Sequence, residues 1–316
     1  MKLILAMTLA ALAVTATAQG YPTKAVRLII PAAPGGNPDV LARMLAQKFS
    51  ESFGRSFIAE NAPGAGGVVA AEVVAKSAPD GHVLMLSDSG ALAINVALNP
   101  NLPYQPLRDF TFITALVTVP TVLVVNTSTP TLREFIELAK SKPGALSYGS
   151  AGTGSIHHLT MAVFASRAGI EVLHVPYKGG TAMVGALLGG EIQAGWSGIP
   201  NVLQAIRTGR LRALCMSTAR RQASLPEVPT AAELGFAGFD IATMIGLIAP
   251  AGTPREIVVR LQGAAAKALR EPDVAERMAN LGMEMVENGT EHFERLVRAD
   301  MERYAEAVRT AGVRHE

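Results

Sequence analysis

Two glycine-rich segments have the composition of anion-binding turns. Residues 34–39 read Pro-Gly-Gly-Asn-Pro-Asp, and residues 149–155 read Gly-Ser-Ala-Gly-Thr-Gly-Ser. Each segment lies between a strand-like apolar run and a helix-like run, so each is expected to lead into a helix. A helix start presents unpaired backbone N–H groups and a partial positive charge, and glycine leaves these groups accessible. The two segments are more than a hundred residues apart. The pattern therefore predicts two lobes that hold one anion between them.

The second segment favours a carboxylate over a nucleotide. Its glycines and hydroxyl residues offer many donors with little side-chain bulk, and a carboxylate accepts several hydrogen bonds at once. A P-loop requires Gly-Lys-Ser/Thr at its end, whereas this segment continues Gly154-Ser155-Ile156. The dinucleotide fingerprint requires a third glycine where His157 stands. Phosphate is therefore not favoured here.

Catalysis and metal binding have weaker support. Residues 195–199 come close to a nucleophile elbow but lack its final glycine. His157 and His158 are adjacent, so on a helix their side chains would point about 100° apart and could not easily share a metal. We therefore expect no catalytic residue, no metal and no cofactor. An exported hydrolase that uses Ser150 or Ser155 with His158 remains an alternative.

Other loops also have the character of ligand-binding segments. Residues 87–90 and 177–181 each follow a strand-like run and precede a helical one. Ligands of open α/β sheets bind beyond the carboxyl ends of the strands, where such loops gather. Each loop by itself fits an ordinary connection equally well. Trp196, the single tryptophan, is as well suited to the core as to a pocket wall.

The N-terminus has the anatomy of a secretory signal peptide. Met1 and Lys2 precede an apolar run over residues 3–14, and Ala16-Thr17-Ala18 forms a small-x-small cleavage site. The apolar run is too short to span a bilayer of ~30 Å. We expect cleavage after residue 18 and a periplasmic protein. The remainder carries 27 basic and 26 acidic side chains. This balance gives no reason to expect nucleic acid or a membrane surface as partner.

Strand-like and helix-like runs alternate along the chain, which predicts an α/β protein with largely parallel sheets. The expected strands cover residues 26–31, 57–61, 82–87, 121–126, 145–148, 172–175, 211–217 and 245–249. The expected helices cover residues 40–53, 67–76, 131–141, 157–168, 182–188, 202–207, 255–269, 272–281 and 290–311. No flexible linker separates two lobes, so we expect the chain to cross between them more than once, near residues 118–126 and 241–247. Residues 19–120 plus 246–316 would form lobe 1, and residues 121–245 would form lobe 2.

The order of several motifs resembles the tripartite tricarboxylate transporter receptor proteins, also called the Bug family. The motifs occupy residues 34–43, 61–67, 79–82, 150–159, 175–179, 225–230 and 246–254, and the resemblance covers essentially the whole chain after residue 18. It implies a periplasmic solute-binding protein with a two-lobed, type II-like binding-protein fold and a ligand cleft between the lobes. It also implies delivery of a small organic acid to membrane transporter subunits. We expect a monomer, and an exported carboxylate sensor remains an alternative.

The resemblance implies that backbone amides and hydroxyls on both sides of the cleft hold the carboxylate. The candidates in lobe 1 are Pro34, Gly35, Gly36 and Asp39. Those in lobe 2 are Ser150, Gly152, Thr153, Gly154, Ser155 and His158, with Tyr177, Gly179 and Thr181 on the same side. Ser89 and Trp196 complete the set, from the loop after a strand and from the pocket wall.

The ligand itself is less constrained by the sequence. Family members often carry an acidic residue near Ser197, an aromatic residue near Met244, and Ser-Thr where this chain has Asn37-Pro38. Trp196 and Met244 would make the distal wall apolar, and Ser197 would remove a partner for a ligand amine. These departures favour a plain mono- or dicarboxylate over an amino acid.

Overall fold

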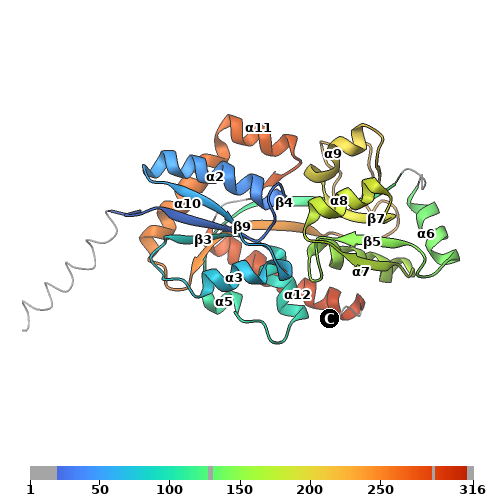
Figure 1. Ribbon diagram of the computed structural model, residues 1–316, viewed down its shortest axis with the longest axis horizontal. Coiled ribbons are helices and arrows are strands. Elements are labelled where there is room, and N and C mark those ends of the chain that lie inside the picture. The colour runs from blue at the N-terminus through green and yellow to red at the C-terminus, as the bar shows by residue number, and fades with distance from the viewer. Residues whose placement is uncertain (1–19, 127–130, 287–288, 312–316) are drawn as a thin grey trace, which may run out of the picture.

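A computed structural model describes residues 20–126, 131–286 and 289–311. The segment interpreted as a signal peptide lies outside these ranges. Two α/β lobes lie side by side along the long axis of the molecule (Figure 1). Over the described residues, no helix is both long and apolar enough to cross a membrane.

A mixed sheet runs through both lobes. The described strands form one ten-stranded sheet in the order β2-β1-β3-β9-β4-β7-β5-β6, with β8 and β10 also paired to β4. The strands are β1 (Val26–Ile30), β2 (Phe57–Asn61), β3 (Val83–Asp88), β4 (Phe110–Val125), β5 (Ser147–Ser150), β6 (Leu173–Pro176), β7 (Ala194–Gly198), β8 (Arg212–Met216), β9 (Ala242–Pro250) and β10 (Glu284–Met285). We call the part built on β1, β2 and β3 lobe 1 and the part built on β5, β6 and β7 lobe 2.

Helices cover both faces of the sheet, as expected for strands that are apolar on both sides. The longer helices are α2 (Asn37–Phe53), α3 (Val68–Ala75), α6 (Leu132–Ser141), α7 (Ile156–Ala168), α8 (Gly180–Gly189), α9 (Ile199–Arg207), α10 (Arg255–Arg270), α11 (Pro272–Asn280) and α12 (Thr290–Ala311). Short turns of helix are η1 (Ala65–Gly67), η2 (Gly90–Ile94), α4 (Asn95–Leu98) and α5 (Pro106–Asp109). In lobe 1, α2, α10 and α11 share one buried cluster, while α3 and α12 contribute to another. In lobe 2, α6 and α7 cover one face, and α8 and α9 cover the other.

Two long strands join the lobes. Strand β4 pairs with β9 from Phe110 to Pro120 and then, from Thr121 onward, with β7 and β8 of lobe 2. Pro120 therefore stands where the neighbours of β4 change. Strand β9 returns the chain to lobe 1, where it pairs with β3. These two strands form the base from which the lobes project.

Helix α12 packs against both lobes. Its Phe293 lies edge-on to Phe112 at 5.3 Å between ring centroids. A Cβ atom on Gly246 would lie 2.1 Å from the Phe293 ring, so this position in β9 has room for glycine only. Further along, Tyr304 and Val308 join the buried cluster of lobe 2. Because α12 contributes to the buried clusters of both lobes, it does not belong to one lobe alone. The division into residues 19–120 plus 246–316 and residues 121–245 stays a prediction.

The local elements follow the sequence closely. The helix predicted over residues 131–141 is α6, and its cap is the expected one, because Thr131 Oγ1 accepts a hydrogen bond from the Glu134 N–H at 3.2 Å. The sequence did not predict the first half of β4 or any part of β7. The prediction of largely parallel sheets was wrong at the centre: β3–β9, β9–β4, β4–β7 and β4–β8 are antiparallel pairs. Parallel pairs occupy the two ends of the sheet, because only there do helical crossovers connect successive strands.

Candidate functional site

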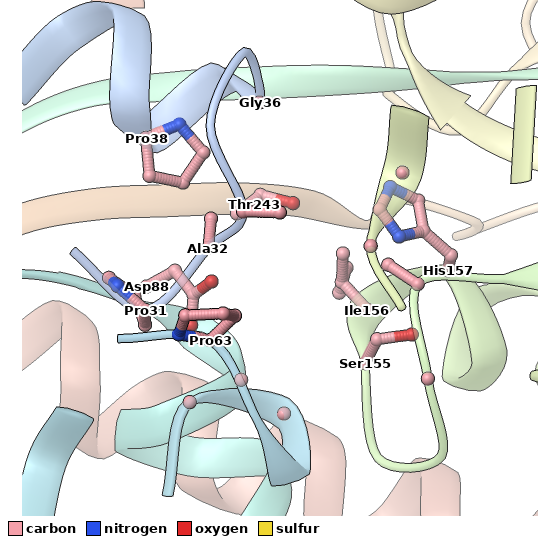
Figure 2. Close-up of a pocket in the computed structure, with 18 of the residues that line it drawn as sticks. Pro31, Ala32, Gly36, Pro38, Pro63, Asp88, Ser155, Ile156, His157 and Thr243 are labelled. Atoms are coloured by element: carbon pink, nitrogen blue, oxygen red, sulfur yellow. The ribbon is translucent and has the colours of Figure 1, made fainter. Parts of the chain in front are cut away.

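A cavity of about 750 Å³ lies between the lobes, and both lobes line it (Figure 2). Its lobe 1 wall consists of residues 31–33, 36, 38, 63–67, 88 and 90. Its lobe 2 wall consists of residues 151–153, 155–157, 177–181, 198 and 201. Val119, Thr243 and Ile245 of the two joining strands also line the cavity. The two glycine-rich segments identified in the sequence therefore contribute to one cavity.

Helix starts converge on this cavity from both sides. The residues that cap helices α2, α3, α7, α8 and α9 are Gly36, Gly67, Ser155, Gly179 and Gly198, and all of them line the cavity. Each helix start carries a partial positive charge of about half an elementary charge. At the glycine caps no side chain accepts a hydrogen bond from the first turn. The wall therefore presents backbone donors and positive potential, which suits a small anion.

In lobe 1 a buried carboxylate holds the turn from behind. Asp39 is 4% exposed, and its Oδ2 accepts the Gly35 N–H at 2.9 Å. Its Oδ1 accepts a hydrogen bond from Asn61 Nδ2 at 2.9 Å and lies 2.9 Å from Arg43 Nη2. Burial alone would raise the pKa of Asp39, but the bonds from Arg43, Gly35 and Asn61 together hold that pKa below its usual value. Asp39 therefore fixes the shape of the turn and lies outside the cavity wall.

In lobe 2 the turn is held from behind by stacked rings. The rings of His158 and His174 are parallel, with centroids 4.0 Å apart, and Tyr148 also stacks on His174, with centroids 5.0 Å apart. The Gly154 N–H donates to His158 Nδ1 at 3.3 Å, and Ser150 Oγ lies 2.7 Å from His174 Nε2. Burial, together with the neighbouring His174, lowers the pKa of His158 to about 4. This support is therefore built from a neutral imidazole.

About half of the site residues expected from the sequence line the cavity. These residues are Gly36, Gly152, Thr153, Ser155, Tyr177, Gly179 and Thr181. The others lie beside or behind it: Pro34, Gly35, Asp39, Ser89, Ser150, Gly154, His158 and Trp196. Pro34 and Gly35 are exposed.

Ser89 and Trp196 have structural surroundings that differ from the expected ligand contacts. Ser89 Oγ donates to Asp300 Oδ2 at 3.1 Å and accepts the Met244 N–H at 3.0 Å, so it ties β3 to β9 and α12. Trp196 is fully buried and stacks on Phe239 at 5.6 Å. Met244 is also buried in the core, whereas its strand neighbours Thr243 and Ile245 line the cavity. Side chains alternate along a strand, and this alternation turns Met244 away from the ligand.

The sequence reasoning missed several lining residues. The segment from Pro63 to Gly67 was noted only as a family motif, although it repeats the pattern of strand, glycine turn and helix start that marks the other walls. His157 lines the cavity in the first turn of α7, and burial lowers its pKa to about 4. Asp88, at the carboxyl end of β3, also lines the cavity, and burial raises its pKa although the Ala91 N–H donates to Oδ1 at 3.1 Å. The sequence marked the loop over residues 87–90 by its position at a strand's carboxyl end, but the candidate named from that loop was Ser89 and not Asp88.

Residues 41–313 match the family model described as the tripartite tricarboxylate transporter family receptor. The chain belongs to this family. BugT of Bordetella pertussis is 36% identical over 308 residues, which are 96% of this chain and 94% of BugT. Receptors of the family are periplasmic solute-binding proteins, and the binding role implied by the sequence motifs is thereby confirmed.

Solved structures agree with this assignment. The Rhodopseudomonas palustris protein Rpa4515, solved with adipate, superposes with a TM-score of 0.89 at 33% identity and covers 93% of this chain and 99% of its own. MatC from the same organism, solved with bound malate, has a TM-score of 0.87 at 32% identity and covers 91% of this chain and 100% of its own. Both matches cover more than nine-tenths of this chain, which confirms the expected two-lobed binding-protein fold.

Proposed function

We propose that this protein captures a small organic carboxylate between its lobes and delivers it to the membrane subunits of a tripartite tricarboxylate-type transporter. The observation that carries the proposal is the convergence of five helix starts, those of α2, α3, α7, α8 and α9, on one cavity. A carboxylate that reaches both walls would accept charge-assisted hydrogen bonds worth about 1.5–3 kcal/mol each. Such bonds form on both sides only when the lobes close, so the ligand would favour the closed arrangement.

The related structures support a carboxylate as the ligand class. Two structural relatives were solved with dicarboxylates, adipate in Rpa4515 and malate in MatC. Residues 1–18 would direct export and be removed, which would place the cavity in the periplasm. The candidates for direct contact are the lining residues of the two turns, above all Gly36, Gly152, Thr153 and Ser155.

We further infer a binding protein and not a hydrolase. Ser155 Oγ accepts the His158 backbone N–H at 3.4 Å, which is the role of a helix cap. Ser150 is fully buried behind the turn, and its hydroxyl donates to the Gly152 carbonyl at 3.0 Å. His158 Nδ1 is engaged by the Gly154 N–H. These contacts support a structural role for the serine and histidine residues that a hydrolase would need at the reacting centre. Turnover of generic ester substrates by the purified protein would contradict this inference.

The substitution Gly36→Asp tests the binding site directly. Gly36 has φ −74° and ψ 166°, a conformation open to any residue, and a Cβ atom there would lie 3.5 Å or more from its neighbours. Aspartate at this N-cap would stabilise α2 by up to about 1 kcal/mol while placing a negative charge where the ligand carboxylate is expected. We expect affinity to fall by about a hundredfold or more with no loss of thermal stability.

The measurement is calorimetry, after a thermal-shift screen with mono-, di- and tricarboxylates, aromatic acids and acidic amino acids. A ligand at a hundred times its Kd raises stability by about 2.7 kcal/mol. The matched control is Gly36→Asn, which has the same shape without the charge and should keep most of the affinity. Equal affinity in the aspartate variant and the wild-type protein would remove α2 from the binding site.

A further inference from the structure

Asp88 places an acidic side chain in the wall of a cavity built for anions. It ends β3, and its carboxyl is directed toward the space between the lobes, on the side opposite Ser155 and His157 (Figure 2). Among the described lining residues it is the only carboxylate, and Lys178, which is exposed, is the only ammonium group. Backbone N–H groups at helix starts can bind an anion without any acidic side chain nearby.

The two walls therefore differ in what they offer to a ligand. Lobe 2 supplies hydroxyl and ring donors from Thr153, Ser155, His157 and Thr181, in addition to its helix starts. Lobe 1 supplies helix starts and, among the side chains of its described lining residues, a single polar group, the Asp88 carboxyl. An ionised carboxylate next to a bound anion is unfavourable unless a donor lies between them. The ligand can supply that donor.

We propose that the natural ligand is a carboxylic acid that also carries a hydrogen-bond donor, a hydroxyl or an ammonium group, and that Asp88 selects it by accepting this donor. The inference rests on the proposed function, since it assumes that the ligand carboxylate is held by the helix starts. It revises the expectation of a plain carboxylate without an amino group. That expectation rested on the absence of an acidic residue at Ser197, and Asp88 in the lobe 1 wall supplies an acidic partner for a ligand donor.

The alternative role for Asp88 is purely local. Its Oδ1 accepts the Ala91 N–H at 3.1 Å and so caps the start of η2. A cap needs only an acceptor atom, which an asparagine side chain also provides. Backbone N–H groups of Gly90 and of Asp88 itself also bond this carboxyl. A carboxyl group has about four acceptor positions, so one position remains for a donor on the ligand. The substitution Asp88→Asn therefore keeps an acceptor oxygen for the Ala91 N–H and removes the acidic group and its second acceptor oxygen, which separates the two roles.

The experiment compares acids of equal length that differ only in the donor. Suitable triples are succinate, malate and aspartate; glutarate, 2-hydroxyglutarate and glutamate; and adipate, 2-hydroxyadipate and 2-aminoadipate. Butyrate, 2-hydroxybutyrate and 2-aminobutyrate extend the series to monocarboxylates. In the wild-type protein we expect a donor-bearing member of at least one series to bind about tenfold or more tightly than its plain counterpart.

In Asp88→Asn this preference should fall below about threefold, through weaker binding of the donor-bearing acid and unchanged or tighter binding of the plain one. The control is Glu72→Gln, which alters a partly exposed carboxylate on α3 that pairs with Lys76 and does not line the cavity, and it should leave the preference intact. Comparison of hydroxy and amino acids shows which donor is selected.

Two results would overturn the inference. One is a wild-type protein that binds the plain acids as tightly as their donor-bearing counterparts, which needs no variant. The other is an Asp88→Asn protein that folds and keeps the full preference. If the wild-type protein binds none of these acids and none of the wider carboxylate panel, the proposed function itself fails, and the inference fails with it.

Discussion

The two turns that face each other across the cavity both present backbone groups at a helix start, but different side chains hold the two turns in place. The lobe 1 turn at α2 is held by an ionic network in which Asp39 collects donors from Gly35, Asn61 and Arg43. The lobe 2 turn at α7 is held by the stacked rings of His158 and His174 and by the Ser150 hydroxyl. In both lobes the ligand would meet backbone, while the polar side chains that stand out in the sequence keep that backbone in shape. The difference predicts that the two walls respond differently to mutation and to acid.

We expect the largest effect from Asp39→Ala, which removes the carboxylate at the centre of the network that holds the lobe 1 turn. It removes a buried acceptor that the part-buried Gly35 N–H and Asn61 amide share, so we expect the free energy of unfolding to fall by about 1–3 kcal/mol. Ligand affinity should fall as well, because the turn loses its fixed geometry. Urea denaturation and calorimetry measure the two effects. Asp39→Asn, which keeps an acceptor, should have an intermediate effect, and an alanine variant as stable as the wild type would contradict the role given to Asp39.

Acid should act first on the lobe 2 support. Burial lowers the pKa of His157 and of His158 from the ordinary 6.5 to about 4, so the unfolded chain binds more protons than the folded protein between these values. The stability contributed by the neutral rings is fully present above about pH 6.5 and is lost as the pH falls toward about 4. The lobe 1 network, in which the pKa of Asp39 is lowered, should fail only below the ordinary aspartate value of 3.8.

We therefore expect the melting temperature to fall by several degrees between about pH 7.5 and about pH 5. The matched variant is His158→Gln, which carries no titrating ring and should show a shallower dependence on pH over this range. A dependence as steep as that of the wild type would assign the acid sensitivity to other groups.

Arg43→Gln should have the smallest effect. Although Arg43 pairs with Asp39, its own side chain is 53% exposed, and exposed ion pairs contribute about 1 kcal/mol or less. We expect a change in unfolding free energy below about 1 kcal/mol and an affinity within about twofold of the wild type. A large loss would show that the charge of Arg43, and not only the acceptor atoms of Asp39, holds the lobe 1 turn.

Local signals predicted most elements and the identity of the two turns. The capping pair Thr131 and Glu134 marked the start of α6, and glycine with following apolar periodicity marked α2 and α7. The same signals did not separate residues that line the cavity from residues one position away. Thr243 lines it while Met244 is in the core, and Ser155 lines it while Gly154 does not. Which side of a strand or turn faces the partner lobe depends on packing, which spacing alone does not encode.

The sequence by itself determined the α/β class, the family, and the fact that glycine turns precede helices in both halves of the chain. The α/β class and the turns depend on interactions between residues close together in the chain, and the family is recognised from the order of its motifs along the chain. The sequence also predicted that the two turns hold one anion between two lobes. Only the tertiary structure showed that the starts of α3, α8 and α9 and the Asp88 side chain line the same cavity. That arrangement depends on β4 and β9, which pair antiparallel across the middle of the sheet and hold segments more than a hundred residues apart at one edge of a shared space. Hydrogen bonding between distant strands fixes it, and no local pattern reports which strands will pair.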